Sequence, residues 1–258
     1  MWVHLPRTVA EAREHLGEGA VPIGGATLVW ATWQRDGFPE QAMSLSRLPQ
    51  ANVVGPEELG GAVVLSRIDG QVPHVLRAAA AAVGTGAVRR TATVGGNIAG
   101  SALRCLLPAA LVLEARATVL APHGVYETDL AEVTAKRPVL LGLRWRTPVA
   151  SAYRKVPAEA SGAPPLVVAT ALHAETGTAT GAAPRAGHRL RAAVRDGYDV
   201  VTATVTCGPD AARPMDQLRG TPLADVPGAW DLIGEQVAML VAAASAEGKA
   251  ADEPRRRD

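Results

Sequence analysis

The sequence predicts an α+β fold. In the first 150 residues, segments with the period of an amphipathic helix alternate with short apolar runs that end at glycine or proline. Residues 166–207 are instead rich in valine and threonine, as β-strands are, and a helix with one apolar face follows at residues 230–244. This order of elements indicates two domains with a break near residue 150.

The first domain is expected to alternate helices and strands. Its first helix begins at a capping box, with Thr8 as N-cap and Glu11 three positions later, and stops at Gly17. Strands are expected at residues 21–23, 42–48, 62–65, 117–120 and 139–145. Helices are expected at residues 28–34, 72–83 and 103–115, with Pro108 near the start of the last one or at a kink.

The second domain is expected to be β-rich and to end in a helix. Its strand candidates are residues 166–174 and 199–207, and the Gly-, Ala- and Thr-rich stretch 176–187 between them is read as a flexible hairpin. The predicted domains are residues 1–150, with subdomains of about 1–50 and 51–150, residues 151–248, and a disordered charged tail at residues 249–258.

Composition excludes several classes of function. Lys and Arg total 26 against 25 Asp and Glu, and aromatic residues are 3%, which argues against a nucleic-acid partner. Cys105 and Cys207 form no C-x-x-C motif, so this chain alone cannot build an Fe–S cluster or a Cys-rich zinc site. With no secretory pattern at the start and no apolar stretch long enough to span a bilayer, the expected location is the cytoplasm.

No standard catalytic motif is present. The six histidines lack metal-ligand spacing, so no metal site and no catalytic residue are predicted. Cys105 falls within the apolar helix expected at residues 103–115 and is expected to be a buried small hydrophobe.

Two glycine pairs carry the strongest chemical signal. Gly24-Gly25 is followed by Ala26-Thr27-Leu28, and Gly95-Gly96 stands between Thr93 and Asn97; each pair follows a strand-like run. Glycine lets backbone N–H groups approach an anion closely, and hydroxyl or amide side chains add donors. Each pair taken alone is better explained as a tight turn, whereas the two loops together could hold one diphosphate from two sides.

The motifs also occur in the order of a known family. Residues 23–28 (IGGATL) are similar to its A-G-G-T-[DS]-L motif, and residues 88–98 (VRRTATVGGNI) to its I-R-N-x-x-T-[IVL]-G-G-N-[LI] motif. Residues 108–115, 153–156 and 216–223 are similar to three further elements. From about residue 5 to 245 the chain resembles a divergent, shortened FAD-binding (medium) subunit of molybdenum hydroxylases of the xanthine and carbon monoxide dehydrogenase type.

This resemblance implies a fold and a cofactor. The fold is a PCMH-type FAD-binding domain of two α/β subdomains, followed by a C-terminal domain with a three-stranded antiparallel sheet and helices. The cofactor is a non-covalent FAD whose diphosphate lies on both glycine loops. Carried over by position, the cofactor-binding residues are Ile23, Gly24, Gly25, Ala26, Thr27, Leu28, Thr93, Gly95, Gly96, Asn97, Ser101 and Lys155.

The chain departs from the family pattern at three places. Ala26 replaces a threonine of the first motif, and Cys105, beside Arg104, stands where the family has an aspartate. The region between residues 48 and 72 is shorter than in relatives. These departures weaken the expected FAD site.

Three functional hypotheses remain from the sequence. The first is an FAD-binding oxidoreductase component that works with molybdopterin and Fe–S subunits on other chains. The second is a stand-alone flavin oxidase of natural-product tailoring that acts on a small organic substrate, with the segment around Arg104 and Cys105 opening space beside the flavin. The third is a non-redox cyclase or isomerase whose FAD site is weakened or lost.

Overall fold

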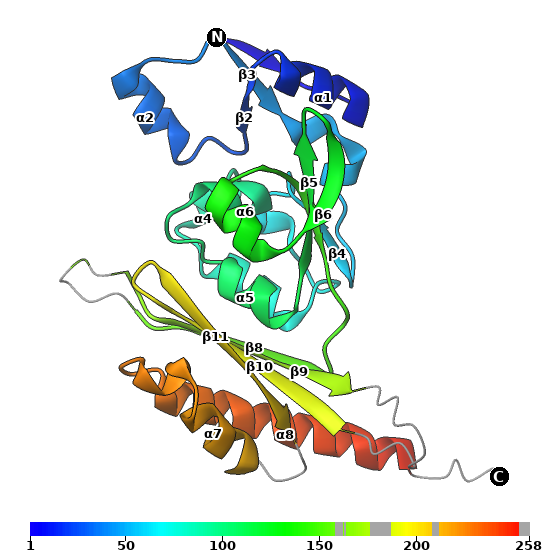
Figure 1. Cartoon of the computed structure of the whole chain (residues 1–258), viewed down its shortest axis with the longest axis vertical. Coiled ribbons are helices and arrows are strands. Elements are labelled where there is room, and N and C mark those ends of the chain that lie inside the picture. Colours follow the sequence, from blue (N-terminus) through cyan, green and yellow to red (C-terminus); the bar gives the residue numbers. More distant parts are fainter. Residues whose placement is uncertain (158–161, 163, 176–186, 208–211, 253–258) are drawn as a thin grey trace. The chain divides into compact units, whose positions relative to one another are not determined.

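The chain forms two compact units in the computed structural model, Met1–Arg146 and Thr147–Asp258 (Figure 1). The structure describes residues 1–157, 162, 164–175, 187–207 and 212–252. Within these residues, no helix is long and apolar enough to cross a membrane. The mixture of helices and sheets confirms the α+β fold class.

The first unit begins with a small parallel sheet of order β1-β3-β2. Its elements are β1 (Trp2–His4), α1 (Val9–Gly17), β2 (Val21–Ile23), α2 (Val29–Asp36) and β3 (Gln41–Ser44). Helix α1 starts at the expected N-cap, where the Glu11 N–H donates to Thr8 Oγ1 at 3.2 Å. The strand expected at residues 42–48 ends early, because the chain turns into short 3-10 segments at Leu45–Arg47 and Pro49–Ala51.

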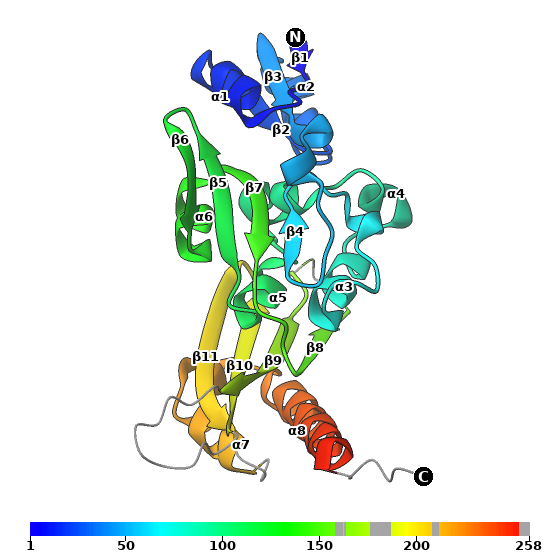
Figure 2. The ribbon, with the colours of Figure 1, turned by 90° about the vertical axis from the view of Figure 1, so that its right-hand side faces the viewer.

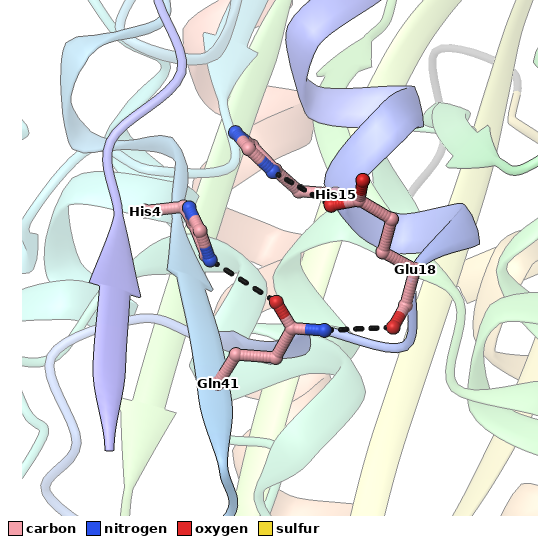
Figure 3. Close-up of polar contacts among 4 residues, drawn as sticks. All are labelled: His4, His15, Glu18 and Gln41. Carbon is pink, nitrogen blue, oxygen red and sulfur yellow. Dashed lines mark hydrogen bonds and ion pairs between the residues drawn. The ribbon is translucent and has the colours of Figure 1, made fainter.

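A polar cluster ties β1, α1 and β3 together (Figure 3). The Gln41 side-chain amide donates to the Glu18 carbonyl oxygen at 2.7 Å, which leaves Gln41 Oε1 to accept from His4 Nε2 at 3.1 Å. This contact therefore places a proton on Nε2 of His4. The His4 ring stacks on His15 with centroids 3.9 Å apart, and His15 Nδ1 contacts Glu18 Oε2 at 3.3 Å.

The first unit also contains a four-stranded antiparallel sheet, with the order β4-β7-β5-β6 (Figure 2). Its strands are β4 (Glu58–Gly60), β5 (Arg116–Ala121), β6 (Gly124–Thr128) and β7 (Val139–Arg144). The helices of this part are α3 (His74–Ala81), α4 (Gly86–Arg89), α5 (Leu107–Val112) and α6 (Leu130–Lys136), with a π-helical turn at Gly96–Gly100.

Two expectations for this region are wrong. Residues 62–65 form no strand; Val64 makes a single bridge to Thr93 and a 3-10 turn follows, because close backbone packing at Gly60 and Gly61 redirects the chain. The run at residues 89–94 before Gly95 is not a strand either: α4 ends at Arg89, a turn follows, and Thr93 makes only the bridge to Val64.

The helix expected at residues 103–115 is shorter than predicted. Helix α5 starts at Leu107, with Pro108 in its first turn. Of the two expected positions for Pro108, near the helix start or at a kink, the first is therefore confirmed. Arg104 has a left-handed backbone (φ 40°), which interrupts the helix before that point. Cys105 therefore precedes the helix, although it is buried as expected.

A shared apolar cluster holds the two sheets of the first unit together. Ala12 of α1, Met43 of β3, Leu120 of β5 and Leu141 of β7 all belong to it, and each is at most 4% exposed. Burial of such side chains is worth roughly 25 cal/mol per Å² of apolar surface. The cluster thus packs α1 and β3 against strands β5 and β7 of the second sheet.

The second unit is an antiparallel sheet of order β11-β10-β9-β8, with helices α7 and α8 against one face (Figure 1). Its elements are β8 (Ala150–Lys155), β9 (Val167–Glu175), β10 (Gly187–Asp196), β11 (Asp199–Cys207), α7 (Ala212–Arg219) and α8 (Trp230–Asp252). The sheet contains one strand more than the three expected, because β8 pairs with β9 over residues 150–155.

Two segments expected to be irregular lie at the limits of the described chain. Residues 176–186 of the expected hairpin lie outside the described residues. The expected tail begins too early, because α8 continues through Asp252, and residues 253–258 lie outside the described chain.

Asn52 supports the turn that follows β3. Its side-chain amide donates to the carbonyl oxygens of Leu45, Ser46 and Leu48 at 3.1, 3.2 and 2.8 Å. We expect Asn52→Ala to lower the free energy of unfolding by about 1–3 kcal/mol, because these carbonyls lose their donor. Asn52→Asp should destabilise at least as much at neutral pH, since a carboxylate would face three carbonyl oxygens. Urea denaturation measures both effects, and an unchanged midpoint for both variants would contradict this role.

Candidate functional site

A cavity of about 530 Å³ opens in the first unit at the carboxyl ends of the parallel strands β2 and β3. Ligands commonly bind at this edge of parallel sheets, where loops leave the strands. Its walls come from the strand ends, both glycine loops and the start of β7. The lining residues are Pro22, Ile23, Gly24, Gly25, Ala26, Met43, Ser44, Leu45, Ser46, Gly61, Ala62, Val64, Thr91, Thr93, Gly95, Gly96, Ala99, Gly100, Arg137, Pro138, Val139 and Leu140.

The first glycine loop, residues 24–28, presents unpaired backbone donors. Ala26 has a left-handed backbone (φ 54°), and its carbonyl accepts from the Trp30 N–H at 3.1 Å. The N–H groups of residues 24–28 have no hydrogen-bond partner in the described part of the chain. Successive N–H groups around a left-handed residue form a concave site for anions. This loop can therefore donate hydrogen bonds to an anion, since its N–H groups are open.

The second glycine loop has a different role, because most of its N–H groups already have partners. The Gly95 N–H donates to the Gly61 carbonyl at 2.8 Å, and the Asn97 N–H donates to the Thr93 carbonyl at 2.9 Å. The Gly96 N–H donates to Thr93 Oγ1 at 3.2 Å. The loop then enters the π-helical turn, a conformation that often occurs at functional sites. It forms a fixed wall of the cavity rather than a set of open donors.

The two loops are in direct contact. A Cβ atom on Gly25 would overlap the Thr91 carbonyl, and one on Gly24 would overlap Thr93 Oγ1. Gly96 also lies against Thr93 Oγ1, at 3.1 Å from its ideal Cβ position. Gly25 is therefore needed for the loops to meet, independently of any ligand, because it faces backbone, whereas a Cβ on Gly24 would require the Thr93 side chain to rotate.

Two serines that sequence reasoning missed also line the cavity. Ser44 ends β3 and Ser46 lies in the turn after it; the Ser46 N–H donates to Ser44 Oγ at 3.4 Å. Their position at and just after the end of β3 could have indicated them, because β3 pairs in parallel with β2 and the two strands end at the same edge. The sequence did not predict that pairing.

Arg137 is the one charged side chain among the described residues that line the cavity. It caps the C-terminal end of α6 in a left-handed conformation (φ 51°, ψ 48°) and precedes Pro138. Nearby, Thr128 donates a hydrogen bond to the Glu132 carboxylate and Lys136 pairs with it at 2.9 Å, which lowers the pKa of Glu132 below its ordinary value. The cavity thus has a cationic edge and no carboxylate among its lining residues.

The structure brings together seven of the twelve predicted cofactor residues at the walls of this cavity. They are Ile23, Gly24, Gly25, Ala26, Thr93, Gly95 and Gly96. Thr27 and Leu28 lie in the same first loop, but outside the lining set.

The other three predicted residues have different surroundings. Asn97 is buried, and its Oδ1 accepts from the Leu106 N–H at 2.9 Å. Ser101 Oγ accepts from the Leu103 N–H at 3.2 Å. Both side chains thus hold the segment before α5. Lys155 lies on β8 of the second unit, where it pairs with Val167, and its cofactor role stays a prediction.

The segment that departs from the family pattern lies outside the cavity wall. Neither Arg104 nor Cys105 is among the lining residues. Arg104 Nη2 donates to the Thr134 carbonyl at 3.1 Å, so the side chain connects this segment to α6. Among the described residues, no group of three or more His, Cys, Asp or Glu side chains is arranged to hold a metal ion.

Comparison with known proteins gives one family. The model for the FAD binding domain in molybdopterin dehydrogenase matches residues 1–140. No curated protein sequence matches the chain significantly.

Solved structures give the same fold over both units. A chain of cyanide-inactivated Cu,Mo-CO dehydrogenase is 17% identical with a TM-score of 0.68, covering 94% of this chain and 98% of that one. A chain of quinoline 2-oxidoreductase from Pseudomonas putida 86 is 16% identical with a TM-score of 0.64, covering 95% and 97%. A chain of reconstituted CO dehydrogenase from Oligotropha carboxidovorans is 19% identical with a TM-score of 0.61, covering 93% and 85%. At these identities, the likeness shows a shared fold.

Substitution of Gly25 tests the contact between the loops. We expect Gly25→Ala to lower the free energy of unfolding by about 1–3 kcal/mol, because its Cβ meets the Thr91 backbone, which cannot move aside cheaply. Gly100→Ala is the matched control: Gly100 also lines the cavity, but a Cβ there meets nothing within 4 Å. Thermal or urea denaturation compares the two. Equal stability of both variants would show that the loops do not need this contact.

Proposed function

Because the chain belongs to the family of FAD-binding domains in molybdopterin dehydrogenases, we propose that it is the FAD-carrying oxidoreductase component of a molybdenum hydroxylase. Its cofactor is FAD, as membership of this family implies. We assign the non-covalent FAD to the cavity of the first unit, with its diphosphate at the first glycine loop. Ile23, Gly24, Gly25, Ala26 and Thr93 are the proposed contacts.

The observation that carries this proposal is the set of unpaired N–H groups at residues 24–28. Gly25 and Ala26 are partly buried, and donors in such positions are usually paired, so their open N–H groups call for an acceptor. The N–H groups of the exposed Gly24, Thr27 and Leu28 extend the same run around the left-handed Ala26. A diphosphate supplies several acceptor oxygens. The cavity volume of about 530 Å³ lies within the range of ligand pockets, so the residues present fit the cofactor.

The chain's own residues position the cofactor and limit its contact with water. Apolar side chains of Met43, Leu45, Val64 and Leu140 line the cavity beside the glycine loops. An apolar wall strengthens the hydrogen bonds that the loop amides give, because the local dielectric is low. FAD, when bound, supplies the electron-transfer chemistry, and the protein tunes it by position and hydrogen bonding.

The proposed partners are molybdopterin and Fe–S subunits on other chains. Support comes from the fold, which this chain shares with single chains of CO dehydrogenase and quinoline 2-oxidoreductase over nearly their full length. A small organic substrate of the assembled enzyme and a cytoplasmic location are part of this proposal. Affinity purification of the tagged chain from its own host tests it: co-purification of the two other subunits is expected, whereas a chain that purifies alone with FAD would favour a stand-alone flavin oxidase.

FAD uptake by the purified chain is the direct test of the cofactor assignment. The protein, incubated with FAD and then freed of excess, should retain about one equivalent and show flavin absorption bands. A colourless protein that takes up no FAD would contradict the proposal and favour the non-redox cyclase or isomerase.

Two substitutions at Ala26 test where the diphosphate binds. We expect Ala26→Pro to weaken FAD binding at least about tenfold, because proline fixes φ near −65° and removes one open N–H. Ala26→Gly should bind FAD within about threefold of the wild type and should be more stable by roughly 0.5–1 kcal/mol, since glycine adopts a left-handed backbone without strain. Fluorescence titration with FAD measures both affinities. Equal binding by the proline variant would move the diphosphate away from this loop.

A further inference from the structure

The charge balance of the cavity is incomplete if only the first glycine loop holds the cofactor. Backbone N–H groups carry partial charges, whereas a diphosphate placed in a largely apolar cavity keeps its negative charge. Arg137 is the one charged side chain among the described lining residues, and no carboxylate stands beside it to neutralise it there. The Arg137 side chain therefore lines the same cavity as the open N–H donors of the first glycine loop, with no carboxylate among the lining residues to balance its charge.

We propose that Arg137 is the side chain that binds the FAD diphosphate, opposite the amides of the first glycine loop. This inference rests on the proposed function, because it assigns a residue to the same site. The planar guanidinium donates several hydrogen bonds in a fork that matches two phosphate oxygens. Arg137 would balance the negative charge of the diphosphate, and the amides of the first glycine loop would hold the diphosphate in place by hydrogen bonds.

The backbone of Arg137 supports a functional role. It is left-handed, at a helix C-terminus where glycine is the preferred residue. A residue with a Cβ is strained in this conformation, and such strain is found more often than average at ligand sites. Of the four left-handed non-glycine residues in the described chain, two line the cavity, Ala26 and Arg137.

The helix that carries Arg137 is held firmly. Asp129 caps its start by accepting from the Glu132 N–H at 2.8 Å, and the Arg137 N–H donates to the Val133 carbonyl at 2.9 Å at its end. Leu130 and Val133 are buried beneath it. The backbone of Arg137 is thus fixed at the cavity edge while its exposed side chain remains available.

Other nearby cations are already engaged. Lys136 pairs with Glu132 at 2.9 Å, and Arg104 donates to the Thr134 carbonyl at 3.1 Å. The Arg137 guanidinium, in contrast, has no hydrogen bond or ion pair with any residue of the described chain. Arg137 is therefore the cationic side chain at this end of α6 that can bind a ligand without first breaking another contact.

The test compares three ligands and three variants. FAD and ADP-ribose contain the diphosphate, whereas riboflavin lacks it. We expect Arg137→Ala to weaken FAD and ADP-ribose binding roughly 10- to 100-fold, the range for a hydrogen bond to a charged group, and to leave riboflavin binding unchanged. Lys136→Ala removes one positive charge from the adjacent position and should leave all three affinities unchanged. Titration calorimetry or flavin fluorescence measures each affinity.

A third variant separates binding from folding. Arg137→Gly should weaken FAD binding as much as Arg137→Ala does, yet raise the melting temperature of the FAD-free protein, because glycine relieves the left-handed strain. The salt dependence of FAD binding should also be shallower in both variants than in the wild type.

The outcomes distinguish the two proposals. A wild-type chain that binds neither FAD nor ADP-ribose would overturn the proposed function itself. A wild type that binds FAD, with Arg137→Ala binding it equally well, would overturn only the role of Arg137. Equal losses for FAD, ADP-ribose and riboflavin would also overturn it, because the residue would then act on the whole cavity rather than on the diphosphate.

Discussion

The contact between the two glycine loops is the constraint on which the site depends. The backbone of Gly24 and Gly25 lies so close to residues 91–93 that any Cβ would overlap the Thr91 carbonyl or Thr93 Oγ1. Packing of this kind holds the end of β2 against residues 91–93, and the apolar cluster around Met43 and Leu141 holds β3 against the second sheet. The cavity exists because the loops meet at this point.

The two loops resemble each other in sequence but differ in what they can bind. At Gly95 and Gly96 the N–H groups donate to Gly61 and Thr93, so this loop is rigid and largely satisfied. Residues 24–28 keep open donors, arranged around the left-handed Ala26. The satisfied loop forms a wall of the cavity, and the open loop is where we propose that the anion binds. A threonine at position 26, as in the motif that residues 23–28 resemble, would be β-branched in a left-handed conformation, and alanine suits this backbone better.

Much of the fold followed from local patterns, whereas most errors came from contacts between distant segments. Short stretches of sequence are enough to predict the helix cap at Thr8, the strand at residues 21–23 and the two glycine loops. The segment at residues 62–65 has strand-like side chains, yet packing at Gly60 and Gly61 leaves it one bridge. Arg137 was not predicted for a similar reason: its proposed role depends on α6 ending beside a cavity whose other walls include residues 22–26 and 43–46. The local sequence around Arg137 and Pro138 does not indicate that this residue lies at the edge of a cavity.

Hydrogen exchange of individual backbone amides tests the central claim most directly. Two-dimensional NMR, recorded with and without FAD, would follow the N–H groups of residues 24–28 and of Gly95 and Gly96 in one sample. The account predicts that the amides at residues 24–28 exchange rapidly in the free protein and become protected when FAD binds, whereas those of Gly95 and Gly96 are protected in both states. Protection that appears at Gly95 and Gly96 but not at residues 24–28 would contradict it, because the anion would then lie on the second loop.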